Sequence, residues 1–192
     1  MKLFFPLVLS VLCLNAFSAT EKAVLAGGCF WCLEPPYEKV PGVISVVSGY
    51  TGGAKANPTY DEVSSGQTGH IEAVEVSYDS SKISFKEVLN IFWRNIDPLD
   101  AKGQFCDKGE QYTSGIFYLN DSQKQIAEES LEKLKTSERF KGKSIASFIR
   151  KAQTFYPAED YHQDYYKKNP VRYKYYRFRC GRDQRLEELW GK

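Results

Sequence analysis

Hydrophobic and polar positions follow two different periods along this chain. Residues 71–78 alternate with a period of two, and residues 42–50 are rich in β-branched side chains between glycines, so both segments predict strands. Ser84 and Glu87 form a capping box ahead of apolar residues, which predicts a helix ending near Asn95. The same reasoning predicts further strands at 21–26, 113–119 and 145–155, and further helices at 122–137, 159–167 and 183–190.

These elements are mixed without a regular alternation of strand and helix. Regular alternation would predict a parallel sheet, whereas the irregular order favours the α+β class. No internal repeat, low-complexity tract or long linker divides the chain, and 192 residues suit one domain. A long polar loop between Leu99 and Gln111 interrupts the pattern, and loops of this length in compact domains are often functional.

The first eighteen residues have a pattern of their own. Lys2 precedes an apolar run, and the run ends in small residues at Ala16, Ser18 and Ala19. This pattern predicts a secretory signal peptide over residues 1–18 and a mature domain over residues 19–192, with retention as a membrane anchor as the alternative. We therefore expect an exported protein, periplasmic or secreted, in an oxidising compartment.

Composition narrows the classes of function. The 26 Lys and Arg residues against 24 Asp and Glu residues leave a formal charge of +2, far from the basic footprint of a general nucleic-acid-binding protein. Charged residues make up 26% of the chain, which excludes a protein with many membrane spans. Tyrosines interleave with Lys and Arg between Tyr161 and Arg185, as in some single-strand binders, but the net charge favours a solvated basic face and no nucleic-acid partner.

The strongest chemical signal is the segment 27–32, which reads Gly-Gly-Cys-Phe-Trp-Cys. Two glycines permit a tight turn after a strand, and backbone N–H groups at the start of a helix favour the thiolate form of a cysteine there. Cys29 is therefore a candidate nucleophile. Phe30 and Trp31 supply an apolar aromatic wall beside its sulfur.

Several ordered blocks of the sequence resemble the A-type peptide methionine sulfoxide reductases. They are residues 27–31, 47–53, 57–60, 69–74, 107–112, 158–163 and 180–183, and together they extend over nearly the whole of 19–192. The resemblance implies a thiol-dependent enzyme that reduces the S epimer of methionine sulfoxide, in proteins and as the free amino acid, to methionine. It also implies a single α+β domain with a mixed β-sheet core, flanking helices in a two-layer, ferredoxin-like arrangement, and a long C-terminal coil.

The resemblance assigns catalytic roles to four residues. Cys29 matches the nucleophile that attacks the sulfoxide sulfur. Glu72 matches the acid that gives a proton to the sulfoxide oxygen, and a carboxyl in an apolar site would have the raised pKa that this role needs. Tyr60 and Tyr112 match two tyrosines whose hydroxyl groups stabilise that oxygen.

Three further residues match the substrate pocket of the family. Phe30 and Trp31 correspond to the wall that holds the methyl group, and Asp107 corresponds to a carboxylate on the substrate side. These assignments have structural alternatives. An aspartate in a loop, such as Asp107, is usually a turn residue. Glu72 in an alternating strand could likewise face solvent. The two histidines, His70 and His162, are expected to pack or to form hydrogen bonds and not to donate the proton.

Attack on the sulfoxide would leave a sulfenic acid on Cys29, which a second thiol can capture as a disulfide. Cys180 matches the C-terminal resolving segment of the family and is the preferred resolving residue, with Cys32 and Cys106 as alternatives. Cys32 departs from the commoner family pattern and creates a Cys-x-x-Cys motif. Regeneration would need thioredoxin or a thioredoxin-like dithiol donor. We expect no metal or organic cofactor. We also expect a monomeric enzyme whose substrates are oxidised proteins and free methionine sulfoxide.

Two other classes of function use the same cysteines. A zinc site would need a second close pair of ligands, but only Cys29 and Cys32 have ligand spacing. A thiol-disulfide oxidoreductase of thioredoxin type would use the Cys-x-x-Cys motif, but the strand order expected around that motif is missing. Measurement of metal content and an insulin-reduction assay would separate both from the reductase.

Overall fold

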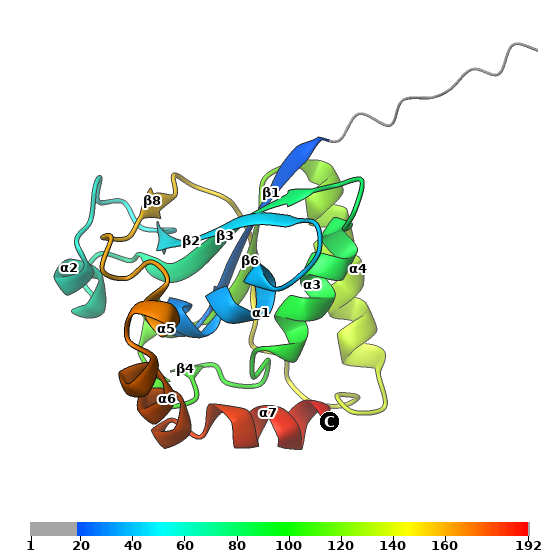
Figure 1. Cartoon of the computed structure of the whole chain (residues 1–192). Helices are drawn as coiled ribbons and strands as arrows, with labels where there is room; N and C mark the ends of the chain where they lie inside the picture. The colour runs from blue at the N-terminus through cyan, green and yellow to red at the C-terminus, as the bar shows by residue number, and fades with distance from the viewer. Residues whose placement is uncertain (1–18, 192) are drawn as a thin grey trace, which may run out of the picture.

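A computed structural model describes residues 19–191, and the predicted signal peptide at 1–18 lies outside the described residues. A six-stranded sheet lies at its centre, with the strands in the order β7-β6-β1-β3-β2-β8 (Figure 1). β6 and β7 are parallel and the other neighbours are antiparallel, so the sheet is mixed, as expected. The strands are β1 (Thr20–Gly27), β2 (Val43–Thr51), β3 (Ile71–Asp79), β6 (Ser114–Tyr118), β7 (Phe148–Lys151) and β8 (Tyr156–Pro157).

Helices follow or connect these strands. The α-helices are α1 (Glu34–Glu38), α2 (Tyr60–Ser64), α3 (Phe85–Arg94), α4 (Asp121–Thr136), α5 (Tyr165–Lys168), α6 (Pro170–Arg179) and α7 (Arg182–Trp190). Two short 3-10 helices, η1 (Phe30–Cys32) and η2 (Glu110–Tyr112), and a small hairpin of β4 (Gly103–Gln104) and β5 (Asp107–Lys108) complete the fold. Within residues 19–191, no helix has both the length and the apolar character needed to cross a membrane.

Four of the strands form a ferredoxin-like core. β1 lies between β3 and β6, and β2 pairs with the other edge of β3. α1 lies between β1 and β2 in the chain, and α3 lies between β3 and β6, which is the split β-α-β arrangement. The expected α+β class and two-layer core are confirmed.

β1 buries both of its faces because neighbouring side chains along a strand point to opposite sides. Ala23 and Leu25 join the main core cluster under the helices, whereas Val24 and Ala26 pack with Phe117 on the other face. α3 and α4 pack against each other over the first face (Figure 1). Packing on both faces therefore fixes the position of the C-terminal end of β1, and with it the start of the turn that follows.

Local signals placed several elements correctly. Ser84 caps α3 by accepting a hydrogen bond from the Glu87 N–H, and the Glu87 carboxylate accepts one from the Ser84 N–H, so the capping box is confirmed. The helix expected at 122–137 is α4, and the strand expected at 113–119 is β6. The strand expected at 145–155 narrows to β7.

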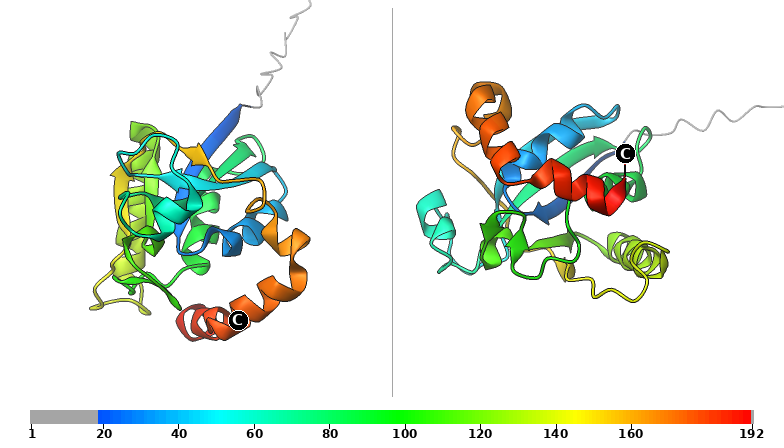
Figure 2. Two further views of the ribbon diagram at one scale, coloured as in Figure 1. Left: turned by 90° about the vertical axis from the view of Figure 1, so that its left-hand side faces the viewer. Right: turned by 90° about the horizontal axis from the view of Figure 1, so that it is seen from below.

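The expected long C-terminal coil is wrong, since most of the chain from Tyr165 to Trp190 is helical in α5, α6 and α7. The helix expected at 159–167 begins only at Tyr165, and α6 was not predicted, because Pro170 is typical of a helix stop. Pro170 instead occupies the first turn of α6, where a missing backbone N–H costs no hydrogen bond. Figure 2 shows these helices as an arc on a different side of the molecule from α4.

Candidate active site

Cys29 stands directly after the central strand, where the chain turns. Gly28 has φ of +78°, a conformation that residues with a Cβ rarely adopt, and a Cβ built on it would lie 2.5 Å from Cβ of Gln104. Glycine is therefore needed on both conformational and steric grounds. Cys29 then caps η1 and is buried, with 6% of its surface exposed.

A small pocket of about 60 Å³ opens beside Cys29. Its lining residues are Cys29, Phe30, Trp31, Tyr60, Glu72, Asp107, Tyr112 and Tyr176. Every residue that the sequence analysis assigned to catalysis or substrate binding is among them, although these residues are spread from β1 to η2. The volume is about twice the share of one water molecule in the liquid, so the pocket suits a small group and not a whole side chain.

Glu72 is the buried carboxyl of the pocket. It lies on β3 with 2% of its surface exposed, and its Oε2 accepts a hydrogen bond from the Phe30 N–H at 3.0 Å. Burial raises the pKa of Glu72 to about 8, although the Phe30 bond lowers it. Glu72 is therefore protonated near neutral pH, and the alternative that it faces solvent is wrong. Glu75 on the same strand forms an ion pair with Lys22 at 2.8 Å.

Tyr60 and Tyr112 bring two hydroxyl groups to the same pocket. Burial raises the pKa of Tyr60 to about 12 and that of Tyr112 still further. Both therefore remain O–H donors at any ordinary pH. Glu159 holds Tyr60 in place, because one of its carboxylate oxygens accepts from the Tyr60 N–H at 2.9 Å and the other accepts from the Tyr50 hydroxyl at 2.8 Å.

Trp31 is fixed from two sides. Its ring stacks on Tyr165, with centroids 3.7 Å apart, and its indole N–H donates to Nδ1 of His162 at 3.0 Å. His162 does not line the pocket, and burial lowers its pKa, so it is neutral and serves as a hydrogen-bond acceptor. His70 is also outside the pocket and bonds the backbone of Lys55 and Gly53.

Cys29 and Cys32 are a pair of buried thiols. The hydrogen bond between them lowers the pKa of Cys32 to about 6, helped by the charges of Arg182 and Arg177. Burial raises the pKa of Cys29 well above its ordinary value, and the negative groups nearby raise it further. The direction of the shift at Cys29 is thus opposite to the expected lowering of its pKa, because desolvation outweighs the short η1 helix.

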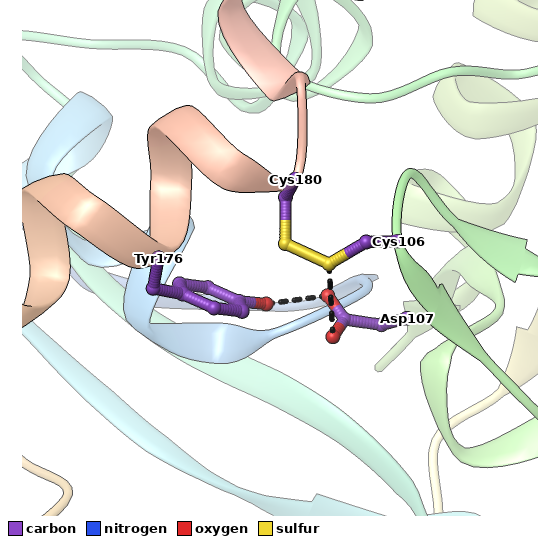
Figure 3. The surroundings of a disulfide bond; sticks show 4 residues. All are labelled: Cys106, Asp107, Tyr176 and Cys180. Carbon is purple, nitrogen blue, oxygen red and sulfur yellow. Dashed lines mark hydrogen bonds between the residues drawn. A yellow bond between two sulfur atoms is a disulfide. The ribbon is translucent and has the colours of Figure 1, made fainter.

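Cys106 and Cys180 form a disulfide at the edge of the pocket (Figure 3). This pairing differs from the preferred one of the sequence analysis, Cys29 with Cys180, and it leaves Cys32 as the thiol beside Cys29. Cys106, Asp107 and Cys180 also cluster closely enough to hold a metal ion, but two sulfurs in a disulfide offer no thiolate ligand.

Sequence reasoning missed three residues that shape the site. Tyr176 lines the pocket from α6, Glu159 anchors Tyr60, and Arg182 is buried, with its guanidinium donating to the carbonyls of Gly27 and Asn95. Glu159 and Arg182 fall within blocks that resemble the family, so a signal existed for them. Tyr176 lies outside those blocks in a run of tyrosines and basic residues, where nothing distinguishes it.

Comparison with known proteins agrees with this geometry. The profile of the family described as peptide methionine sulfoxide reductase matches residues 21–192. Peptide methionine sulfoxide reductase MsrA of Bacillus licheniformis is 51% identical over 172 residues, which cover 90% of this chain and 94% of that protein. The MsrA of Listeria innocua is 50% identical over 170 residues, covering 88% and 96%.

Solved structures of similar fold point the same way. Methionine sulfoxide reductase A of Corynebacterium diphtheriae has a TM-score of 0.74 at 34% identity, covering 79% of this chain and 76% of that one. Reduced Mxr1 of Saccharomyces cerevisiae also has a TM-score of 0.74, at 32% identity, covering 82% and 89%. With a family match over almost the whole described domain and relatives at about half identity, the chain belongs to the A-type peptide methionine sulfoxide reductases.

Proposed function

We propose that this protein reduces the S epimer of methionine sulfoxide, free and within oxidised proteins, with Cys29 as nucleophile and Glu72 as acid. Thiol-dependent reduction of methionine sulfoxide is the activity of its family. The observation that carries the assignment of residues is the convergence of a buried thiol and a protonated carboxyl in one pocket, walled by Phe30 and Trp31.

The first step transfers the oxygen. The methyl group of the substrate packs against the aromatic wall, and its oxygen faces the hydroxyls of Tyr60 and Tyr112. The Cys29 proton passes to Cys32 as the Cys29 sulfur bonds to the sulfoxide sulfur, and Glu72 gives its proton to the oxygen. Transfer of the hydroxyl group leaves sulfenic acid on Cys29 and releases methionine, so sulfur of the substrate is reduced and Cys29 is oxidised.

The second step closes a disulfide. We assign Cys32 as the resolving thiol, because it is the free thiol that interacts with Cys29, whereas Cys180 is already bonded to Cys106. The Cys32 sulfur attacks the sulfenic sulfur, a Cys29–Cys32 disulfide forms, and the hydroxyl leaves as water with the proton of the Cys32 thiol. Cys180 and Cys106 remain the alternatives that the experiment below distinguishes.

An external dithiol then restores the two thiols. Thioredoxin or a thioredoxin-like protein is the proposed donor; Mxr1, the yeast protein of similar fold, has a solved complex with Trx2. The signal-peptide pattern supports a location outside the cytoplasm, in the periplasm or secreted, for both the enzyme and its donor. We propose that a monomer without metal or organic cofactor is sufficient, because the pocket already combines a nucleophile, an acid and two hydroxyl donors.

The test is reduction of the separated S and R epimers with dithiothreitol and then with thioredoxin. We expect turnover of the S epimer only, abolished by Cys29→Ser with either donor. Cys32→Ser should retain activity with dithiothreitol, which can reduce a sulfenic acid directly, and lose it with thioredoxin, whereas Cys180→Ser should keep activity with both donors at saturating substrate. Turnover that survives Cys29→Ser would overturn the proposed function.

Two readouts refine this test. Mass spectrometry of the alkylated protein after one turnover should show a Cys29–Cys32 disulfide, and a disulfide of Cys29 with Cys180 or with Cys106 would give the resolving role to that cysteine. Amino-terminal sequencing of the exported protein should begin at Ala19. A start at Met1 in the membrane fraction would instead support a retained anchor.

A further inference from the structure

Tyr176 is a pocket residue without an assigned role. Its ring meets Trp31 edge-on, with centroids 5.8 Å apart and planes at 81°, and its hydroxyl donates to Oδ2 of Asp107 at 2.5 Å. Trp31 and Asp107 are two of the three residues expected to hold the substrate. One side chain from the C-terminal helices thus contacts both of them inside the pocket.

The Cys106–Cys180 disulfide brackets this hydrogen bond. Cys106 immediately precedes Asp107, and Cys180 lies one helical turn after Tyr176, where its N–H donates to the Tyr176 carbonyl at 2.9 Å. Figure 3 shows the disulfide and the Tyr176–Asp107 bond side by side between the same two segments. The disulfide therefore ties two segments that are 74 residues apart in the chain at the place where each contributes a side chain to the pocket.

The helix that carries Tyr176 buries little apolar surface. Tyr173 is its one buried residue, and Val171, Tyr175 and Phe178 expose 81%, 66% and 79% of their surface. A helix with so little buried apolar surface is weakly held by packing alone. The covalent bond at its C-terminal end accordingly has a large share in keeping Tyr176 against Asp107.

We propose that Tyr176 is a substrate-binding residue and that the Cys106–Cys180 disulfide is the tie that keeps it in the pocket, so that opening this disulfide weakens binding of methionine sulfoxide. The proposal rests on the proposed function, because it concerns the same pocket. The ring of Tyr176 adds an apolar surface next to Trp31 on which the substrate sulfur and methyl group can pack. The Cys106–Cys180 disulfide is separate from the Cys29–Cys32 pair, whose thiols are oxidised in the reaction.

Binding can be measured without turnover in the full chain carrying Cys29→Ser and Cys32→Ser. The probe is the S epimer of N-acetylmethionine sulfoxide, titrated by calorimetry before and after treatment with a water-soluble phosphine. The phosphine breaks the Cys106–Cys180 bond, and one water molecule supplies the oxygen of the phosphine oxide and the proton that each sulfur takes up. Tyr176→Ala and the pair Cys106→Ser with Cys180→Ser are added to this parent, and Tyr175→Ala, on the same helix but turned to solvent, is the matched control.

We expect phosphine treatment, the paired serine substitutions and Tyr176→Ala each to raise Kd about tenfold, the effect of losing a packed aromatic side chain from a binding pocket. Tyr176→Ala should no longer respond to phosphine, which a general loosening of the fold would not produce. Tyr175→Ala should behave as the parent does. A Tyr176→Ala chain that binds as tightly as the parent, or still weakens on reduction, would overturn the inference, whereas a parent that does not bind the S epimer would overturn the proposed function.

Discussion

The backbone N–H of Phe30 donates to Oε2 of Glu72 at 3.0 Å, which joins the residue after the nucleophile to the proposed acid on β3. The two residues are 42 positions apart in the chain. Their bond orients one carboxylate oxygen toward the backbone, and burial keeps the group protonated near neutral pH. Position and protonation state of the acid are thus set by the same local structure.

Glu72→Gln should slow the first turnover about a hundredfold or more. The amide keeps the shape and the hydrogen bond of the carboxyl group but cannot donate a proton as an acid near neutral pH. Rapid-quench measurement of methionine release gives the rate. Glu75→Gln is the control on the same strand, since Glu75 pairs with Lys22 at the surface. Equal rates for the wild type and Glu72→Gln would remove Glu72 from the mechanism.

The rate of the first turnover should depend on pH with two limbs. It should rise through about pH 6, as the thiol pair loses one proton, and fall through about pH 8, as Glu72 loses the proton that it must donate. In Cys32→Ser the lower limb should move to higher pH, because burial then holds the Cys29 proton with no thiolate neighbour to accept it. An unchanged lower limb in that variant would show that Cys32 does not take the proton.

His162 should act through Trp31 and not through proton transfer. His162→Phe leaves the Trp31 indole N–H without its acceptor, so we expect a higher KM and a loss of about 1 to 3 kcal/mol in the free energy of unfolding. His162→Asn offers an amide oxygen and should recover part of both losses. The two limbs of the pH profile should be unchanged in both variants, and the disappearance of either limb would make His162 an acid or base.

Arg182 should matter both for stability and for the thiol pair. Arg182→Met leaves the carbonyls of Gly27 and Asn95 without their donor, so the free energy of unfolding should fall by about 2 to 4 kcal/mol in denaturant titrations. It also removes a positive charge that lowers the pKa of Cys32, so the lower limb of the pH profile should shift upward. Arg179→Met, at an exposed position of α6, should change the stability by less than about 0.5 kcal/mol. An Arg182→Met variant as stable as the Arg179→Met variant would contradict this role.

The secondary structure near strong local signals could be predicted. The Ser84–Glu87 capping box and the period of two in β3 depend on residues within a few positions, so α3 and β3 appeared where expected. α6 did not, because the same Pro170 that ends one helix can begin the next. A local pattern cannot distinguish these two uses of proline when packing decides between them.

The identities of the pocket residues were also within reach of the sequence, because each of Cys29, Tyr60, Glu72 and Tyr112 stands in a motif that resembles the family, and the fold brings these residues to one pocket. Tertiary structure alone decided the pairing of Cys106 with Cys180, the place of Tyr176 and the burial that raises the pKa of Cys29. Disulfide partners depend on distances between segments 74 residues apart, and pKa values depend on burial and on charges that other elements contribute. Neither quantity is encoded in the neighbouring residues of the chain, so both exist only once the chain has folded.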